Sequence, residues 1–197
     1  MKHFSMIREF HAADLFTIAN GACGTLAVFQ AMQIIERRDR GSLYGAAILV
    51  PLALVFDFLD GRVARWRHSA SPLGRELDSL ADVISFGVAP AAIGYAAGLD
   101  TVIDQMILVF FVLCGLSRLA RYNVTAEALA DDAGKVSHFE GTPIPTSVVP
   151  LALLLLAFRG GSLYPIELLG LRLHLVSVLF AISGSLMISK TIRIPKP

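Results

Sequence analysis

The sequence predicts an all-α, polytopic membrane protein with six transmembrane helices and an N-terminal amphipathic interfacial helix, in a single domain over residues 1–197. Composition is the first reason: 55% of the residues are hydrophobic and 17% are charged, against about 25% charged in typical soluble domains. The mean hydropathy is +0.65. The second reason is that uncharged runs recur six times along the chain, which a soluble core of this length does not need.

The first 14 residues differ from the rest in being polar and charged. Phe4, Ile7 and Phe10 recur every third residue among basic and acidic neighbours. This spacing is typical of a short helix that lies in the membrane surface, and a frayed, exposed terminus is the alternative. The segment lacks the apolar core of a cleavable signal peptide.

The six uncharged runs predict the six spans. They cover residues 15–35, 41–56, 83–99, 105–117, 141–158 and 173–189. A span needs about 20 residues, so the second run reaches that length by extending to Asp57 and Asp60, and the third by starting at Asp78 and Asp82. We therefore expect these acids at the ends of membrane helices, on one side of the bilayer.

Charge outside the runs predicts the orientation. With six spans, most of the 17 Lys and Arg residues fall on the side that holds both termini. The positive-inside rule then places the termini and the acidic residues in the cytoplasm. The net charge of +1 predicts no nucleic-acid partner. Cys23 and Cys114 lie inside apolar runs and are expected to pack as small hydrophobic side chains.

Four aspartates in two neighbouring helices are the main candidates for chemistry. Asp57 and Asp60 are three residues apart, and Asp78 and Asp82 are four apart, so each pair shares a helix face. Carboxylates that crowd together repel one another and favour cations between them. All-oxygen ligands suit Mg²⁺ or Mn²⁺. Helix caps or solvated charges are the alternative interpretation.

The same residues form a longer pattern. It has Asp, two residues, Asp-Gly, two residues, Ala-Arg, eight residues, Gly, three residues, Asp, three residues and Asp. The fixed positions are Asp57, Asp60, Gly61, Ala64, Arg65, Gly74, Asp78 and Asp82. This pattern resembles the signature of the CDP-alcohol phosphatidyltransferases, a family with a six-helix membrane fold.

The resemblance implies that a CDP-linked lipid donates its phosphatidyl group to an alcohol and releases CMP. It implies two divalent cations, Mg²⁺ or Mn²⁺, with Asp57, Asp60 and Asp78 as ligands. Asp82 would bind the second ion and also act as the general base that takes the proton of the acceptor hydroxyl.

Other positions in the pattern imply contacts with the donor. Gly61 would let the nucleotide approach the backbone, Arg65 would contact a phosphate or the cytidine, and Ala64 and Gly74 would leave room for the nucleotide. Asn20, in the first run, could hydrogen-bond either a substrate or another helix.

Three further segments resemble the small integral-membrane phosphatidylserine synthases, a branch of the same family. They are Asn20-Gly-Ala-Cys-Gly24, Ser117-Arg-Leu-Ala-Arg-Tyr-Asn123 and Phe139-Glu-Gly-Thr-Pro-Ile-Pro145. The resemblance implies CDP-diacylglycerol as donor and L-serine as acceptor. Tyr122 replaces the usual Phe, and Thr142 replaces the usual Leu.

Within these segments, the residues expected to bind the acceptor or a phosphate are Arg118, Arg121, Asn123 and Thr142. Arg118 and Arg121 are three apart and can offer two cations to a phosphate or to the serine carboxylate. Anchoring of the span on the cytoplasmic side is the alternative role for both arginines.

The family is usually dimeric, and small residues in the spans allow close helix packing, so a homodimer is expected. Three rival functions stay open. One is the same reaction with inositol phosphate or glycerol phosphate as acceptor, or with an ether-lipid donor such as CDP-archaeol. The others are a small ion transporter, which the absence of repeats disfavours, and a non-catalytic scaffold.

Overall fold

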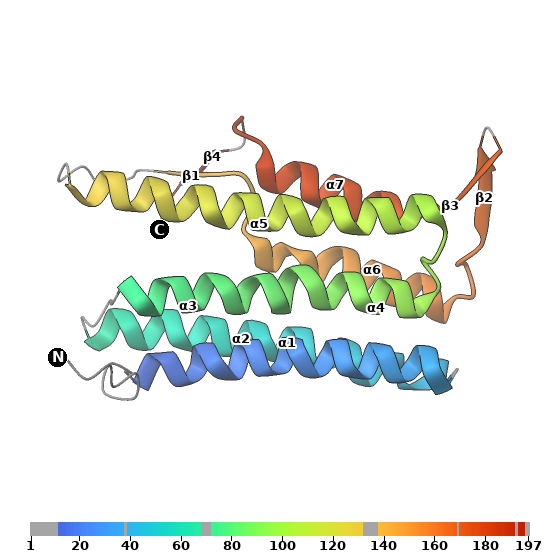
Figure 1. Cartoon of the computed structure of the whole chain (residues 1–197), viewed down its shortest axis with the longest axis horizontal. Helices are drawn as coiled ribbons and strands as arrows, with labels where there is room; N and C mark the ends of the chain where they lie inside the picture. Colours follow the sequence, from blue (N-terminus) through green and yellow to red (C-terminus); the bar gives the residue numbers. More distant parts are fainter. Residues whose placement is uncertain are drawn as a thin grey trace, which may run out of the picture.

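Helices occupy all six of the predicted apolar runs (Figure 1). The computed structural model describes residues 12–37, 39–67, 72–131, 138–168, 170–191 and 193–195. The interfacial helix expected over residues 1–14 therefore lies outside the described residues, apart from its last three, which begin α1.

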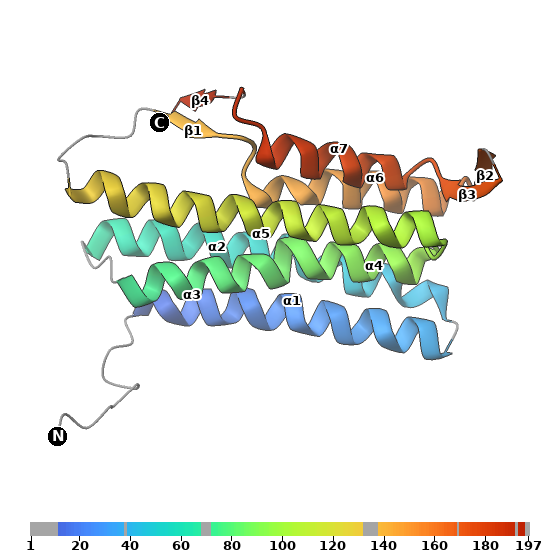
Figure 2. The same cartoon turned by 45° about the horizontal axis from the view of Figure 1, so that its top comes forward.

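Four long helices run parallel or antiparallel to one another (Figures 1 and 2). They are α1 (Ala12–Arg37), α2 (Leu43–Arg67), the continuous helix of α3 (Pro72–Asp82), η3 (Val83–Val88) and α4 (Ala89–Ala97), and α5 (Val102–Asp131). All four are long and apolar enough to cross a membrane. A short 3₁₀ turn, η2 (Arg40–Ser42), joins α1 to α2.

Two shorter helices complete the bundle. A 3₁₀ turn, η4 (Ile144–Ser147), leads into α6 (Val148–Arg159), and α7 (Ser177–Ile188) follows after a hairpin. Both are apolar but shorter than the helices that qualify as spans. The structure thus supports four of the six predicted spans by length and composition.

Two small antiparallel strand pairs are a correction to the all-α prediction, so the fold is mostly helical rather than all-α. Strand β2 (Pro165–Leu168) pairs with β3 (Leu171–His174), and β1 (His138–Glu140) pairs with β4 (Arg193–Pro195). The first hairpin reverses at Gly170, whose φ of 78° favours glycine. Both pairs lie outside the helical bundle (Figure 2): β2–β3 lies at one end, and β1–β4 lies alongside α5 in the other half of the molecule.

A second finding concerns residues 123–131, which lie beyond the fourth uncharged run. They continue α5 as a helix to Asp131. Nothing in the apolar pattern marks this extension, because it begins where the apolar run has already ended.

The core is built from pairs of helices. α1 packs mainly on α2, and α5 packs on α7. Phe111 of α5 meets Phe180 of α7 edge to face, with ring centroids 5.3 Å apart. Tyr44 of α2 meets Phe158 of α6 in the same way at 6.2 Å.

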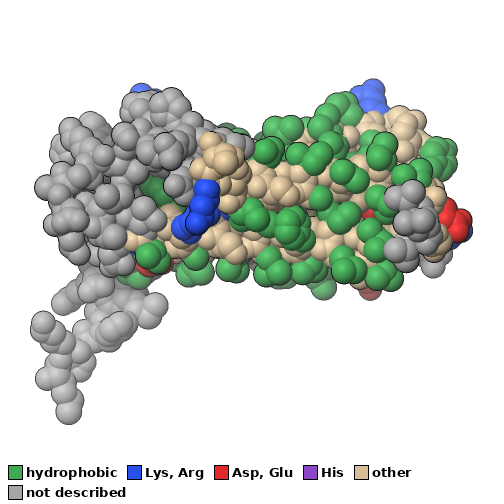
Figure 3. All heavy atoms as spheres, turned by 90° about the horizontal axis from the view of Figure 1, so that it is seen from above, with side chains coloured by type: hydrophobic (Ala, Val, Ile, Leu, Met, Phe, Trp, Pro, Cys, Tyr) green, Lys and Arg blue, Asp and Glu red, His purple; other side chains and the backbone are tan. Residues whose placement is uncertain are grey.

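The outer surface of the bundle is apolar. Large hydrophobic side chains on several helices are more than half exposed, among them Leu15, Phe29, Ile48, Leu113 and Leu156. Figure 3 shows hydrophobic side chains over much of the visible face. An apolar belt on helices of this length is typical of contact with lipid.

One close approach locks α1 against the third long helix. At Gly24 a side chain would meet the Ser85 backbone, with its Cβ 2.7 Å from the Ser85 Cα. Ser85 lies in η3, a π-helical segment that starts directly after Asp82. Glycine at position 24 therefore lets α1 reach the segment that carries Asp82, and π-helical turns often occur beside functional residues.

Candidate active site

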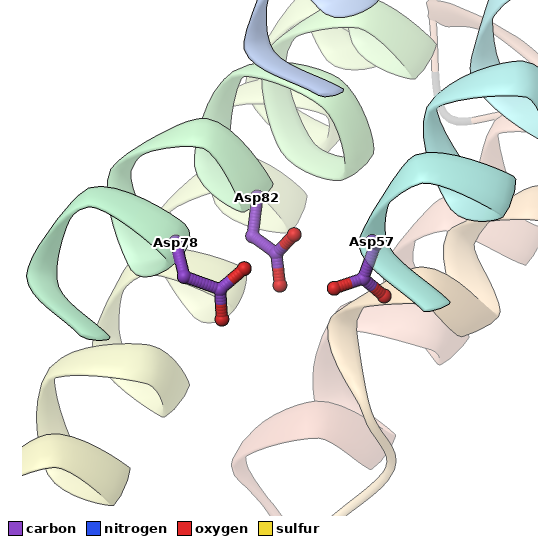
Figure 4. A group of neighbouring side chains, drawn as sticks. All are labelled: Asp57, Asp78 and Asp82. Carbon is purple, nitrogen blue, oxygen red and sulfur yellow. The ribbon is translucent and has the colours of Figure 1, made fainter. Parts of the chain in front are cut away.

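Three aspartates converge between two helices (Figure 4). Asp57 comes from α2, whereas Asp78 and Asp82 come from successive turns of α3. One carboxylate oxygen from each lies within 4.8 Å of the others. Asp82 is buried, at 7% exposure, and Asp57 and Asp78 are half-buried. We call these three residues the acid triad.

Among the described residues, the acid triad has fewer hydrogen-bond donors and cations around it than carboxylates. Among the described residues, Asp57 and Asp78 make no hydrogen bond or ion pair, and Asp82 accepts one hydrogen bond, from Asn20. Three carboxylates held this close repel one another unless a cation lies between them or protons neutralise them. An all-oxygen donor set fits a hard divalent cation, so the acid triad could hold a metal ion.

Asp60 belongs to the same helix as Asp57 but has a different partner. Its Oδ2 accepts a hydrogen bond from the hydroxyl of Thr17 on α1, and Asp14 lies close enough to interact with its charge. The prediction that four acids face one point is therefore met by three, with Asp60 beside them at the junction with α1.

Asn20, on α1, is fully buried beside the triad. Its Nδ2 donates to Asp82 Oδ1 at 3.0 Å, and Ser85 Oγ donates to the Asn20 backbone carbonyl at 2.8 Å. The Asn20 Oδ1 is buried and has no partner among the described residues. The structure therefore shows the helix contact that the sequence left open for Asn20, with one oxygen still available to a ligand.

Thr17 and Ser85 are the residues of this site that sequence reasoning missed. Thr17 and Asn20 are three apart on α1 and so share the face that meets the acids. Thr17 and Ser85 are both polar residues inside an apolar run. Such residues most often hydrogen-bond within their own helix, so they gave no reason to single them out.

The two arginines of α5 point to different neighbours. Arg118 lies close enough to Asp82 for the charges to attract, and its guanidinium stacks on the Tyr122 ring at 5.7 Å. Arg121 instead donates to the Ile188 carbonyl at 3.4 Å, at the last turn of α7. Arg118 is thus the arginine that faces the acid triad.

The remaining candidates for acceptor binding lie on either side of this point. Asn123 Nδ2 donates to Ser79 Oγ at 3.0 Å and to Glu76 Oε2 at 3.2 Å, which ties α5 to α3. Thr142 donates its backbone N–H to Leu186, while its buried hydroxyl has no partner among the described residues.

The small residues of the signature lie in the same two helices as the acids. A side chain at Gly61 would meet nothing within 4 Å, so packing inside the chain does not require glycine there. Gly74 lies in the first turn of α3. The Ala64 and Arg65 side chains lie outside the described residues, although both belong to α2.

The candidate spans include the acids, as the sequence predicts: Leu43–Val63 contains Asp57 and Asp60, and Leu73–Ala97 contains Asp78 and Asp82. The acids lie inside the helices, however, and not at their last residues. α2 continues for about 15 Å beyond Asp57 to Arg67, and α3 begins about 9 Å before Asp78. The residues that follow Asp60 are polar enough to end an apolar run without ending the helix, which explains why hydropathy misplaced the boundary.

A bundle of membrane-length apolar helices, with carboxylates from two of them directed at one point, defines a membrane protein with a candidate divalent-cation site. Residues 10–184 match the family described as CDP-alcohol phosphatidyltransferase. The chain belongs to this family, as its signature residues suggested, and it is an integral membrane protein.

Individual relatives agree with this assignment. A CDP-diacylglycerol–serine O-phosphatidyltransferase of Saccharomyces cerevisiae is 44% identical over 99% of this chain and 74% of the yeast protein. A Bacillus subtilis protein of the same name is 32% identical over 71% of this chain and 72% of its own length. An archaetidylserine synthase of Methanothermobacter thermautotrophicus is 39% identical over 71% of this chain and 55% of its own length.

Proposed function

We propose that this protein transfers the phosphatidyl group of CDP-diacylglycerol to the hydroxyl of L-serine, forming phosphatidylserine and releasing CMP. The observation that carries the proposal is the acid triad, which lies within a signature of the family whose serine-using members are similar to this chain.

The acids have distinct tasks in this proposal. Asp57, Asp78 and Asp82 hold cations through the oxygens that face one another, and Asp60 adds its Oδ1, since its Oδ2 is bonded to Thr17. Two divalent cations, Mg²⁺ or Mn²⁺, would polarise the pyrophosphate and offset charge on the leaving CMP.

Asp82 is the proposed general base. Asn20 donates to its Oδ1, and no described residue hydrogen-bonds its Oδ2, which would take the serine hydroxyl proton. The serine oxygen then bonds to the phosphorus that carries diacylglycerol, and the bond from that phosphorus to the oxygen of CMP breaks. Asn20 fixes the direction of the carboxylate and so acts as a positioning residue.

Different residues are proposed to bind the donor and the acceptor. The family signature assigns four residues to donor binding: Gly61, Ala64, Arg65 and Gly74. The open space at Gly61 supports this assignment. Arg118 is the best-placed cation for the serine carboxylate or a phosphate, because it faces Asp82 and is partly buried. Arg121, Asn123 and Thr142 are the proposed supporting residues for the acceptor or a phosphate.

The proposed setting is a bilayer crossed six times. α6 and α7 would span with help from their flanking turns, residues 1–14 would lie on the surface as an interfacial helix, and the whole chain would form one domain. The distribution of Lys and Arg supports cytoplasmic termini and a cytoplasmic active site.

A homodimer is part of the proposal, supported by the exposed apolar helix faces and the small residues in the spans. Light scattering in several mild detergents should give twice the mass of one chain after correction for detergent. A mass of one chain in every detergent contradicts the dimer.

The archaeal relative offers a second candidate for the donor. Its name specifies an archaetidyl group, so the donor of this chain could instead be CDP-archaeol. The acceptor is serine in both cases, and the two donors differ in how their tails are linked to glycerol.

The test is one assay with the purified protein. With CDP-diacylglycerol, Mn²⁺ or Mg²⁺ and labelled serine, we expect CMP release and a labelled lipid in equal amounts. Parallel reactions contain CDP-archaeol, or inositol phosphate or glycerol phosphate in place of serine. Consumption of either phosphate without serine would overturn the acceptor, and release of no CMP in any reaction would overturn the reaction.

A further inference from the structure

A pocket of about 520 Å³ lies at the end of the bundle opposite the acid triad. It is bordered by the end of α4, the start of α5, the end of α6 and the β2–β3 hairpin, which meet at one end of the molecule in Figure 1. Asp104 on this side and Arg118 on the other are about 21 Å apart along α5. The pocket is therefore separate from the proposed active site.

One lining residue of the pocket, His174, is held by several hydrogen bonds. His174 is bound twice by the buried Asp104, through its backbone N–H to Oδ1 at 3.0 Å and through Nδ1 to Oδ2 at 2.7 Å. The His174 carbonyl accepts from Ser177 Oγ at 2.7 Å. These contacts fasten the hairpin to α5 and α7 beside the pocket.

The same contacts determine what His174 offers to a ligand. Because the carboxylate of Asp104 accepts at Nδ1, that nitrogen carries a proton and donates. When the ring is neutral, Nε2 is therefore an acceptor. No described residue contacts Nε2 through a hydrogen bond. His174 lines the pocket, so it adds an acceptor there.

The pocket also carries one charge of each sign. Arg172 and Asp100 both line it, and neither makes an ion pair with any described residue. An arginine binds phosphate oxygens through its fork of donors, while a carboxylate and an imidazole acceptor together suit an ammonium group. Phe158 and Leu163 supply an apolar wall.

We propose that this pocket binds the headgroup of a zwitterionic aminophospholipid, with its phosphodiester on Arg172 and its ammonium group on Asp100 and His174. The volume falls within the range of about 300–1,000 Å³ that is usual for small-ligand sites. The pocket lies at the ends of membrane-length helices, where lipid headgroups are found. The exposed apolar side chains of those helices offer contacts for the acyl chains.

The experiment measures lipid retention by the purified full chain in detergent, using native mass spectrometry. The lipids are phosphatidylethanolamine, which has both charges, and phosphatidylglycerol, which lacks the ammonium group. Glycerophosphoethanolamine, which lacks the tails, is added as a soluble competitor. The parent protein should retain phosphatidylethanolamine at least tenfold better than phosphatidylglycerol, and the soluble competitor should not displace it at equal concentration.

Two variants and one control separate the contacts. Arg172→Gln should lower phosphatidylethanolamine retention at least tenfold, and Asp100→Asn should remove the preference over phosphatidylglycerol. Arg159→Gln is the matched control, because Arg159 is exposed at the same end but does not line the pocket. All three should unfold at the parental temperature, since Arg172, Asp100 and Arg159 are exposed.

Equal retention by Arg172→Gln and Arg159→Gln would overturn the proposal, as would a parent protein without preference between the two lipids. Displacement by glycerophosphoethanolamine at equal concentration would show that the ligand is a soluble phosphate ester and would overturn the assignment to a lipid. None of these measurements depends on the transfer reaction.

Discussion

Buried carboxylates at the two ends of this bundle are held in opposite ways. Asp104 is fully buried, and the chain itself supplies its partners: the His174 ring and backbone, and the hydroxyl and backbone N–H of Thr101. In the acid triad, Asp57 and Asp78 make no hydrogen bond among the described residues. A carboxylate that accepts hydrogen bonds from its own chain stabilises the fold, whereas a carboxylate without such partners is suited to binding a ligand.

The largest expected effect is on turnover, at Asp78. Asp78→Asn removes a charge from the proposed cation site, so CMP release should fall by more than the factor of about 10² to 10⁴ typical of losing a general base alone. Repulsion within the triad also falls, so the metal-free protein should unfold at the same or a higher temperature. Turnover and thermal unfolding are measured on the same preparation.

Glu36→Gln is the matched control for Asp78→Asn, because it removes an exposed acid at the end of α1, away from the triad. It should leave both quantities unchanged. A lower unfolding temperature for Asp78→Asn would place this residue with Asp104, as a structural carboxylate, and would remove the distinction between the two ends.

The next effect separates Asp82 from its neighbours. Asp82→Asn keeps an oxygen ligand and the side-chain size but cannot accept the serine proton, so turnover should fall by about 10² to 10⁴. Binding of CDP-lipid at fixed Mn²⁺ should be better preserved than in Asp57→Asn. Titration of CDP-lipid against each purified variant measures this.

The general-base assignment to Asp82 is wrong under either of two results. One is that Asp82→Asn loses nucleotide binding as completely as Asp57→Asn. The other is that it turns over at nearly the parental rate.

A smaller effect is expected at Asn20, which holds Asp82 without touching the reacting atoms. Residues that hydrogen-bond to a metal ligand and orient it typically contribute a factor of about 10 to 100 to activity. Asn20→Ala should therefore lower kcat by that amount and leave KM for the donor unchanged. Steady-state kinetics with varied CDP-lipid measures both. Thr25→Val, which removes a hydroxyl bonded within α1, is the control. A raised KM with unchanged kcat would assign Asn20 to donor binding instead.

Local spacing predicted that four aspartates from two neighbouring helices meet, and three of the four do. The separations of Asp78 from Asp82 and of Asp57 from Asp60 fix helix faces, and the short connection between the helices brings those faces together. The convergence of Asp57, Asp78 and Asp82 follows from that geometry. Asp60 shows the limit of reasoning from local spacing. Its hydrogen-bond donor, Thr17, lies 43 residues away in the sequence and could not be foreseen from the spacing of the acids.

The rest of the architecture depends on contacts between distant residues. Asp104 and His174 are 70 residues apart, and neither stands in a local pattern that marks it. The π-helical turn after Asp82 is likewise invisible to hydropathy, since Val83–Val88 is apolar in any helical form. The two strand pairs are short and lie outside the helical bundle, where no apolar periodicity predicts them.

The smallest effect on turnover, and the largest on stability, is expected at Asp104. Asp104→Ala leaves the His174 ring, its backbone N–H and the Thr101 hydroxyl without their acceptor in a buried place. Breaking a buried pair by removing one partner costs about 3–5 kcal/mol of unfolding free energy. Turnover per folded molecule, measured well below the unfolding temperature, should match the parent, because the triad lies at the other end of α5. In the double variant with His174→Ala, part of the cost should be recovered, since no ring is left unpaired. If Asp104→Ala stays folded but loses turnover, the two ends of the bundle are coupled through α5. Asp104 would then serve the reaction as well as the fold.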